Sequence, residues 1–129
     1  MVAICGRYYI DDGIDSGELQ EIIDTVNRRS NADQVKTSSE IFPTDTVPII
    51  ANSRAMAPSA FAMTRGYSLP DGKRIINARS KSAEEKPMFR DGMAQRRCAV
   101  PATNYFEWEC AGKQKTKYAI RPAGNGLIY

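Results

Sequence analysis

The fold is decided by residues 97–121, which read RCAVPATNYFEWECAGKQKTKYAIR. This stretch contains three short runs with the composition of β-strands, at 97–100, 105–109 and 117–121. The sequence Ala111-Gly112-Lys113, between the last two runs, is typical of a tight turn. The stretch therefore predicts an antiparallel hairpin preceded by a further strand.

The rest of the chain predicts one amphipathic helix and several more strands. Residues 15–29 are expected to be helical, because apolar side chains recur there at helical spacing: Leu19, Ile22, Ile23 and Val26. Residues 30–40 predict a loop, and a short helix interrupted by Pro87 is expected over 82–93. Strands are expected at 5–10, 47–50, 59–64 and 74–78, with a turn at Pro70-Asp71-Gly72. Because the order is mixed, we predict an α+β fold, as a strongly bent antiparallel sheet or open β-barrel with peripheral helices.

Length and composition indicate a single globular domain over residues 1–129. The sequence has neither a long apolar run nor a secretory signal pattern, so no membrane association is expected. Three widely spaced cysteines without a CxxC pair favour a reducing compartment, and we predict a cytoplasmic protein. The sequence contains no histidine, which excludes Cys-His and Ser-His dyads and histidine metal ligands within these residues.

Charge is distributed unevenly along the chain. Residues 11–45 carry nine acidic and three basic side chains, whereas residues 65–97 carry nine basic and four acidic ones. A basic segment of this kind suits a phosphate backbone. The alternative is a solvated face whose charge is compensated elsewhere in the fold.

Two short motifs carry side chains suited to binding and proton transfer. Asn77 and Arg79 lie two apart on an expected strand and would share one face, where Asn could orient a hydroxyl or amine and Arg could hold a phosphate. Glu107 lies between two large aromatic residues, and a partly desolvated carboxyl can carry protons near neutral pH. Trp108 could stack on a base. The alternatives are a polar strand end, a solvent-facing glutamate and a core tryptophan.

Cys5 would have unusual chemistry if it were the first residue. Its α-amine and thiol would form a 1,2-aminothiol, in which the amine condenses with an aldehyde and the thiolate closes onto the imine carbon as a thiazolidine. An α-amino group is competent near neutrality because its pKa is about 7.7–8.0. The alternative is a buried structural cysteine, which is also the reading for Cys98.

Taken in order, five segments resemble the SOS response-associated peptidase (SRAP) family: Cys5-Gly6-Arg7, Val47-Pro48-Ile49-Ile50, Ile76-Asn77-Ala78-Arg79, Glu85-Lys86-Pro87-Met88-Phe89, and RCAVPA followed by Phe106-Glu107-Trp108. The resemblance implies a protein of the DNA damage response that binds single-stranded DNA and cross-links abasic sites through an N-terminal cysteine. It implies Cys5 as the nucleophile, Asn77 orienting it and Glu107 as the proton carrier. The expected DNA contacts are Arg7, Arg65, Arg79, Arg90 and Trp108. No metal or organic cofactor is implied, and the oligomeric state is left open.

The sequence departs from the family at both ends. In the family the cysteine directly follows the initiator methionine, whereas Met1-Val2-Ala3-Ile4 precede it here. The chain stops at Gly126-Leu127-Ile128-Tyr129, which reads as the start of a strand, and the histidine-bearing segment of family domains is absent. We therefore expect the N-terminal majority of a domain truncated at its C-terminus.

Two other functions stay open at this point. One is a cysteine peptidase that cleaves itself or other proteins, which would need a base partner for Cys5. The other is an inert nucleic-acid-binding remnant, which would bind DNA with a steep salt dependence and form no covalent product.

Overall fold

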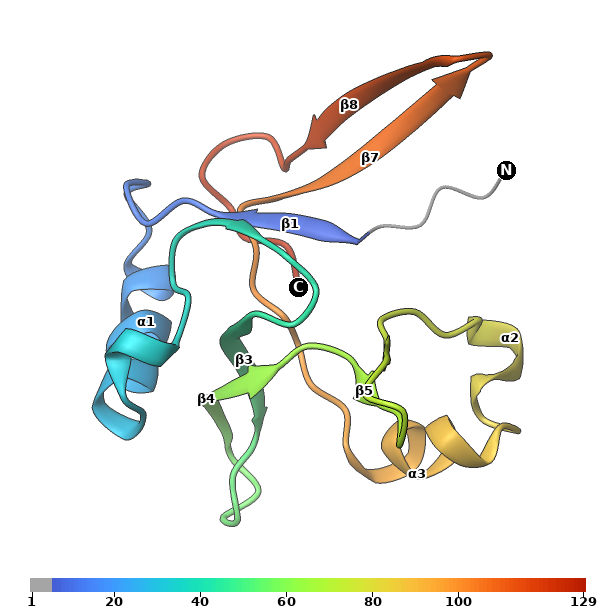
Figure 1. Ribbon diagram of the computed structural model, residues 1–129. Helices are drawn as coiled ribbons and strands as arrows, with labels where there is room; N and C mark the ends of the chain where they lie inside the picture. The colour runs from blue at the N-terminus through green and yellow to red at the C-terminus, as the bar shows by residue number, and fades with distance from the viewer. Residues whose placement is uncertain (1–5) are drawn as a thin grey trace.

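The computed structural model describes residues 6–129, so Cys5 lies outside the described residues. The chain is a mixture of short helices and antiparallel strands, which confirms the predicted α+β class (Figure 1). In chain order the elements are β1 (Arg7–Ile10), α1 (Gly17–Arg29), η1 (Ala32–Gln34), β2 (Ser39–Ile41), β3 (Thr46–Asn52), β4 (Pro58–Thr64), β5 (Tyr67–Ser68), β6 (Arg74–Ile75), α2 (Ser80–Ala83), α3 (Pro87–Gln95), β7 (Asn104–Ala111) and β8 (Gln114–Ile120).

The described strands form separate antiparallel sheets and do not close into a barrel. The largest sheet has the order β2-β1-β7-β8, and β3-β4 and β5-β6 form two-stranded sheets. The predicted hairpin is confirmed, because β7 and β8 pair along their length from Tyr105–Ile120 to Ala111–Gln114. Gly112 in its turn has a φ of 62°, which glycine adopts without strain. This hairpin projects from the body of the molecule (Figure 1).

The strand expected at 97–100 is reduced to one bridge, between Ala99 and Ile50. These two residues exchange backbone hydrogen bonds of 2.8 and 2.9 Å. Continuing the register by two residues would bring Pro101 opposite Pro48, and neither proline has an N–H to donate. The ladder therefore ends there. The predicted loop 30–40 likewise contains η1 and the first residues of β2.

Helix α1 confirms the periodicity of residues 15–29. Ser16 caps it, since the Ser16 hydroxyl accepts a hydrogen bond of 3.3 Å from the Leu19 N–H, and Arg28 and Arg29 lie at its C-terminal end. Its buried side chains are Leu19, Ile22, Ile23 and Val26. They pack against β3 and β4 and join two apolar clusters that connect this sheet with β1 and β2.

The segment from β5 to α3, which we call the lobe (residues 67–95), differs from the sequence prediction. The expected strand 74–78 covers only Arg74–Ile75, because its partner β5 supplies just two residues. Asn77 and Arg79 therefore do not share a strand face, and Arg79 precedes the first turn of α2. The interrupted helix is two helices, with Pro87 at the start of α3, where its missing N–H costs nothing. Among the described residues, no helix is both long and apolar enough to cross a membrane.

Candidate functional site

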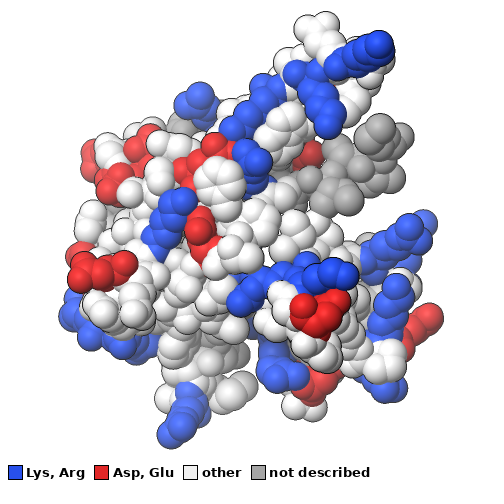
Figure 2. All heavy atoms as spheres, viewed as in Figure 1, with Lys and Arg blue, Asp and Glu red and all other residues white. Residues whose placement is uncertain are grey.

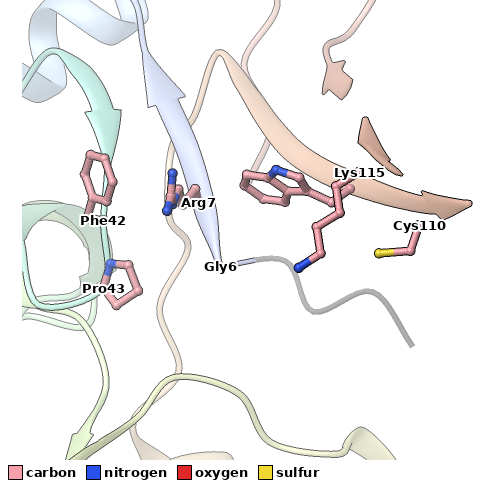
Figure 3. A pocket seen from close by; sticks show the side chains of 7 residues that line it. Gly6, Arg7, Phe42, Pro43, Cys110 and Lys115 are labelled. Carbon is pink, nitrogen blue, oxygen red and sulfur yellow. The ribbon is translucent and has the colours of Figure 1, made fainter. Parts of the chain in front are cut away.

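Two hollows lie close to Gly6, the residue that directly follows Cys5. The first, which we call the hairpin hollow, has a volume of about 390 Å³ and lies beside the β7–β8 hairpin (Figure 3). It is lined by Gly6, Arg7, Phe42, Pro43, Trp108, Cys110 and Lys115. The second, the lobe hollow, has a volume of about 670 Å³. It is lined by apolar side chains of β3, β4 and α3 together with Arg65, Asn77, Arg96 and Cys98.

Cations and aromatic rings alternate across one face of the large sheet. Arg7 lies opposite Phe106, and Trp108 lies opposite Lys117, so these four side chains share that face. The Arg7 guanidinium carbon is 4.7 Å from the Phe42 ring centroid and 5.4 Å from that of Trp108. The Lys117 ammonium is 3.9 Å from the Phe106 centroid and 5.6 Å from that of Trp108. Such interleaving offers planar surfaces for bases and positive charge for phosphates.

Glu40 holds the two cations of this face in place. Its carboxylate accepts hydrogen bonds from Lys117 at 2.9 Å and from Arg7 at 3.3 Å. The hydrogen bond from Lys117, followed by the one from Arg7 and their positive charges, holds the pKa of Glu40 below its ordinary value. One carboxylate therefore links β2, β1 and β8.

Glu107 belongs to the opposite face of the same sheet, with Tyr8 and Tyr105. One carboxylate oxygen of Glu107 is buried and has no hydrogen-bond partner in the described part of the chain. The Tyr8 hydroxyl is also buried without a hydrogen-bond partner in the described part of the chain. Burial raises the pKa of Tyr8 well above its usual range. Buried polar atoms normally have a hydrogen-bond partner. On this face, the Glu107 oxygen and the Tyr8 hydroxyl could therefore each form a further hydrogen bond.

In the lobe hollow, Arg65 reaches back to the start of β1. Its Nη1 donates a hydrogen bond of 2.9 Å to the Gly6 carbonyl, and its guanidinium carbon is 5.1 Å from the Tyr8 ring centroid. Asn77 lines the same hollow. Cys98, expected in the core, is instead exposed on its wall, although the partial burial of its thiol raises the pKa.

The expected site residues thus fall into separate groups. Arg7 and Trp108 meet at the hairpin hollow, and Arg65 and Asn77 meet at the lobe hollow. Arg79 is exposed and lines neither, while Arg90 is exposed in a groove on α3 that also contains Arg97. On the face seen in Figure 2, Lys and Arg side chains project from the β7–β8 hairpin, and they stand among acidic side chains on the lobe. The proposed nucleophile, Cys5, lies outside the described residues.

Sequence reasoning missed Phe42, Glu40 and Lys117. Lys117 could have been found, because Lys115 and Lys117 alternate along a strand whose partner carries Phe106 and Trp108 at the same period. Phe42 and Glu40 carried no such signal, since only the pairing of β2 with β1 brings them to this face. Within residues 6–129, no cluster of three or more acidic or cysteine side chains could hold a metal ion.

Comparisons with known proteins agree with the resemblance in the sequence. The abasic site processing protein YoqW of Bacillus subtilis is 40% identical over 50 residues, which are 39% of this chain and 22% of that protein. The abasic site processing protein YMR114C of Saccharomyces cerevisiae is 38% identical over 56 residues, which are 43% of this chain and 15% of that protein. The matched stretches thus span less than a quarter of these relatives.

A crystal structure of a protein from Bordetella bronchiseptica has the same fold, with a TM-score of 0.66 at 16% identity. The match covers 95% of this chain and 60% of that one. The family model for SOS response associated peptidase (SRAP) matches residues 4–129. Because that match takes in nearly all of the sequence, the chain belongs to the SRAP family.

Proposed function

We propose that this chain binds single-stranded DNA at abasic sites and forms a covalent thiazolidine cross-link through Cys5, once Cys5 is the first residue. The two relatives from Bacillus subtilis and Saccharomyces cerevisiae are both named abasic site processing proteins, which supports an abasic site as the substrate. The observation that carries the proposal is the position of Gly6. The peptide bond tethers Cys5 to Gly6, which lines the hairpin hollow with Arg7 and Trp108 and accepts a hydrogen bond from Arg65 of the lobe hollow. Gly6 directly precedes Arg7 and Tyr8, whose side chains lie on the Trp108 face and on the Glu107 face of the sheet respectively.

The chemistry balances without a cofactor. The Cys5 amine adds to the aldehyde of the ring-opened abasic sugar and expels its oxygen as water, which leaves an imine. The Cys5 thiolate then attacks the imine carbon, a carbon–sulfur bond forms, and the nitrogen takes up a proton to complete the ring. Both steps need the free α-amine, so the bond between Ile4 and Cys5 must first be hydrolysed if residues 1–4 are present. The peptidase activity in the family name is consistent with such a step.

The roles of the other residues are part of the same proposal. Glu107 carries protons to and from the intermediates, and its buried, unpartnered oxygen supports this role. Asn77 orients the reacting groups. Arg7, Arg79 and Arg90 contact phosphates, and Trp108 stacks on a base, as its place in a face of alternating cations and rings supports.

A denaturing gel tests the proposal. Protein is mixed with a single-stranded oligonucleotide that carries one abasic site, and the 1–129 chain is compared with a chain that starts at Cys5. We expect a band stable to denaturation only from the chain that starts at Cys5, and none from its Cys5→Ser variant. Cys110→Ser is the matched control, because Cys110 lines the hairpin hollow and offers a competing thiol. Equal yields from the two chains, or a yield that depends on Cys110, would contradict the mechanism.

A further inference from the structure

We propose that Arg65 is a positioning residue of the cross-linking site, whose guanidinium fixes the peptide that follows Cys5. This inference rests on the proposed function, and it gives Arg65 a different role from the DNA contact that the sequence suggested. It rests on three features: the contacts of Arg65 with the start of β1, the way Arg65 is itself held, and the short covalent path from Gly6 to Cys5.

The side chain of Arg65 holds the start of β1 at two points. It donates a 2.9 Å hydrogen bond to the Gly6 carbonyl, and its guanidinium packs at 5.1 Å over the ring of Tyr8. Tyr8 is 7% exposed, so the ring is a fixed platform. Gly6 directly precedes β1, and because it has no Cβ it would otherwise have wider backbone freedom than the residues of that strand. The contact restricts the residue whose conformation directs the chain toward Cys5.

The backbone of Arg65 is fixed between two other segments. Its N–H donates to the Asp45 carbonyl at 3.2 Å, and its own carbonyl accepts from Arg74 Nη1 at 3.2 Å. Gly66, which follows, has a φ of 91°, and a Cβ there would come within 3.2 Å of the Ile75 carbonyl. The guanidinium therefore extends from a rigid base toward Gly6.

The covalent path from this anchor to the reacting groups is short. The α-nitrogen of Cys5 is separated from the Gly6 carbonyl by two residues, which span at most about 7 Å. Misplacement of a reacting group by about 1 Å can lower a rate by about 100-fold. An anchor at Gly6 is thus close enough to influence the orientation of the amine and the thiol.

Positioning and DNA binding predict different effects of mutation. A phosphate contact strengthens DNA binding, whereas a positioning contact changes the rate at which bound DNA reacts. Arg65 is half-buried and already engaged with a carbonyl and a ring, unlike the exposed Arg79 and Arg90. The geometry therefore favours an effect on rate.

The test uses the chain that starts at Cys5 and its Arg65→Gln and Arg65→Lys variants. Arg54→Gln is the matched control, because Arg54 is exposed in the β3–β4 turn and its loss removes the same charge. The Kd is measured with an oligonucleotide that carries a tetrahydrofuran abasic analogue, which has no aldehyde. The cross-linking rate constant is measured in single turnover at saturating abasic DNA.

We expect Arg65→Gln to lower the rate constant by about 100-fold while its Kd stays within about twofold of the parent. Arg65→Lys should recover part of the rate, since an ammonium can donate to the same carbonyl, and Arg54→Gln should match the parent. A raised Kd with an unchanged rate at saturation would overturn the inference and make Arg65 a DNA contact. Equal rates in parent and Arg65→Gln would also overturn it.

If the parent forms no adduct, the proposed function fails, and the anchor is then measured directly. Heteronuclear ¹⁵N relaxation of the Gly6 and Arg7 amides reports their order in the parent and in the variants. We expect that order to fall in Arg65→Gln and to be retained in Arg65→Lys. Unchanged order in Arg65→Gln, in a variant with the parent's denaturation midpoint, would contradict the anchoring role.

Discussion

At the scale of single residues, the proposed proton carrier is Glu107, one of whose carboxylate oxygens is buried without a hydrogen-bond partner among residues 6–129. We predict that Glu107→Gln lowers the single-turnover cross-linking rate by about 10²–10⁴-fold and leaves DNA binding intact, because an amide cannot exchange protons as a carboxyl does. Glu109→Gln is the control, since Glu109 lies two residues further along β7, exposed and hydrogen-bonded to Tyr118. Equal losses in the two variants would remove Glu107 from its role.

Trp108 tests the binding surface at the same scale. Loss of one base–aromatic contact typically costs about 1–3 kcal/mol, so Trp108→Ala should weaken binding of single-stranded DNA by roughly 5- to 150-fold. Tyr118→Ala is the matched control, because Tyr118 is an exposed aromatic residue on the opposite face of the same hairpin. Fluorescence anisotropy with a labelled oligonucleotide measures both. Similar Kd values for the two variants would show that bases do not stack on this face.

At the scale of elements, the turn between β4 and β5 depends on Gly66. Its φ of 91° is unfavourable for other residues, and a Cβ would crowd the Ile75 carbonyl. We predict that Gly66→Ala lowers the free energy of unfolding by about 1–3 kcal/mol. In contrast, Gly17→Ala should be neutral or stabilising, since nothing lies within 4 Å of its would-be Cβ. Urea denaturation midpoints decide between these outcomes, and a neutral Gly66→Ala would be evidence against strain.

Elements with local signals could be predicted from the sequence. The spacing of Leu19, Ile22, Ile23 and Val26 defines α1, and Gly112 between two strand-like runs defines the β7–β8 hairpin. The lobe could not be predicted in the same way. The length of β6 depends on how many residues β5 offers as partners, and pairing of this kind leaves no local pattern.

The sequence predicts which types of residue form the candidate site, but it does not predict how they are arranged in space. Arg7 and Trp108 were both expected to contact DNA, and they do lie at one hollow. Asn77 and Arg79 were expected on one strand face, but the chain leaves the strand at Ile75. Glu40 joins the cations only through the register of β2 with β1, which the sequence does not encode locally.

At the scale of the whole molecule, the Glu40 carboxylate links three strands of the large sheet. Its pKa in the folded protein lies below the ordinary 4.5, so the ionised form stabilises the fold above that pH. This stabilisation is lost as the pH falls through the lowered pKa. We predict that the parent loses more stability than Glu40→Gln when the pH drops from neutral to below 4.5. Because the ion pairs of Glu40 with Arg7 and Lys117 are partly solvated, we expect a small difference in acid sensitivity between the parent and Glu40→Gln.

Thermal denaturation at several pH values measures this difference, with Glu85→Gln as the control. Glu85 is exposed in the lobe and far along the chain from the large sheet. The control should follow the acid sensitivity of the parent. A Glu40→Gln variant that also follows the parent would show that the bridge from β2 to Arg7 and Lys117 contributes nothing to the fold.

The proposed thiazolidine between Cys5 and an abasic site can be located by mapping the adduct on the protein. The chain that starts at Cys5 is reacted with abasic single-stranded DNA, digested with nuclease and protease, and analysed by tandem mass spectrometry. We predict that the sugar remnant is found only on the peptide that begins with Cys5, with the loss of one water. A sugar remnant on Cys98 or Cys110 would contradict the proposed thiazolidine. The same remnant on a chain that still carries residues 1–4 would also contradict it.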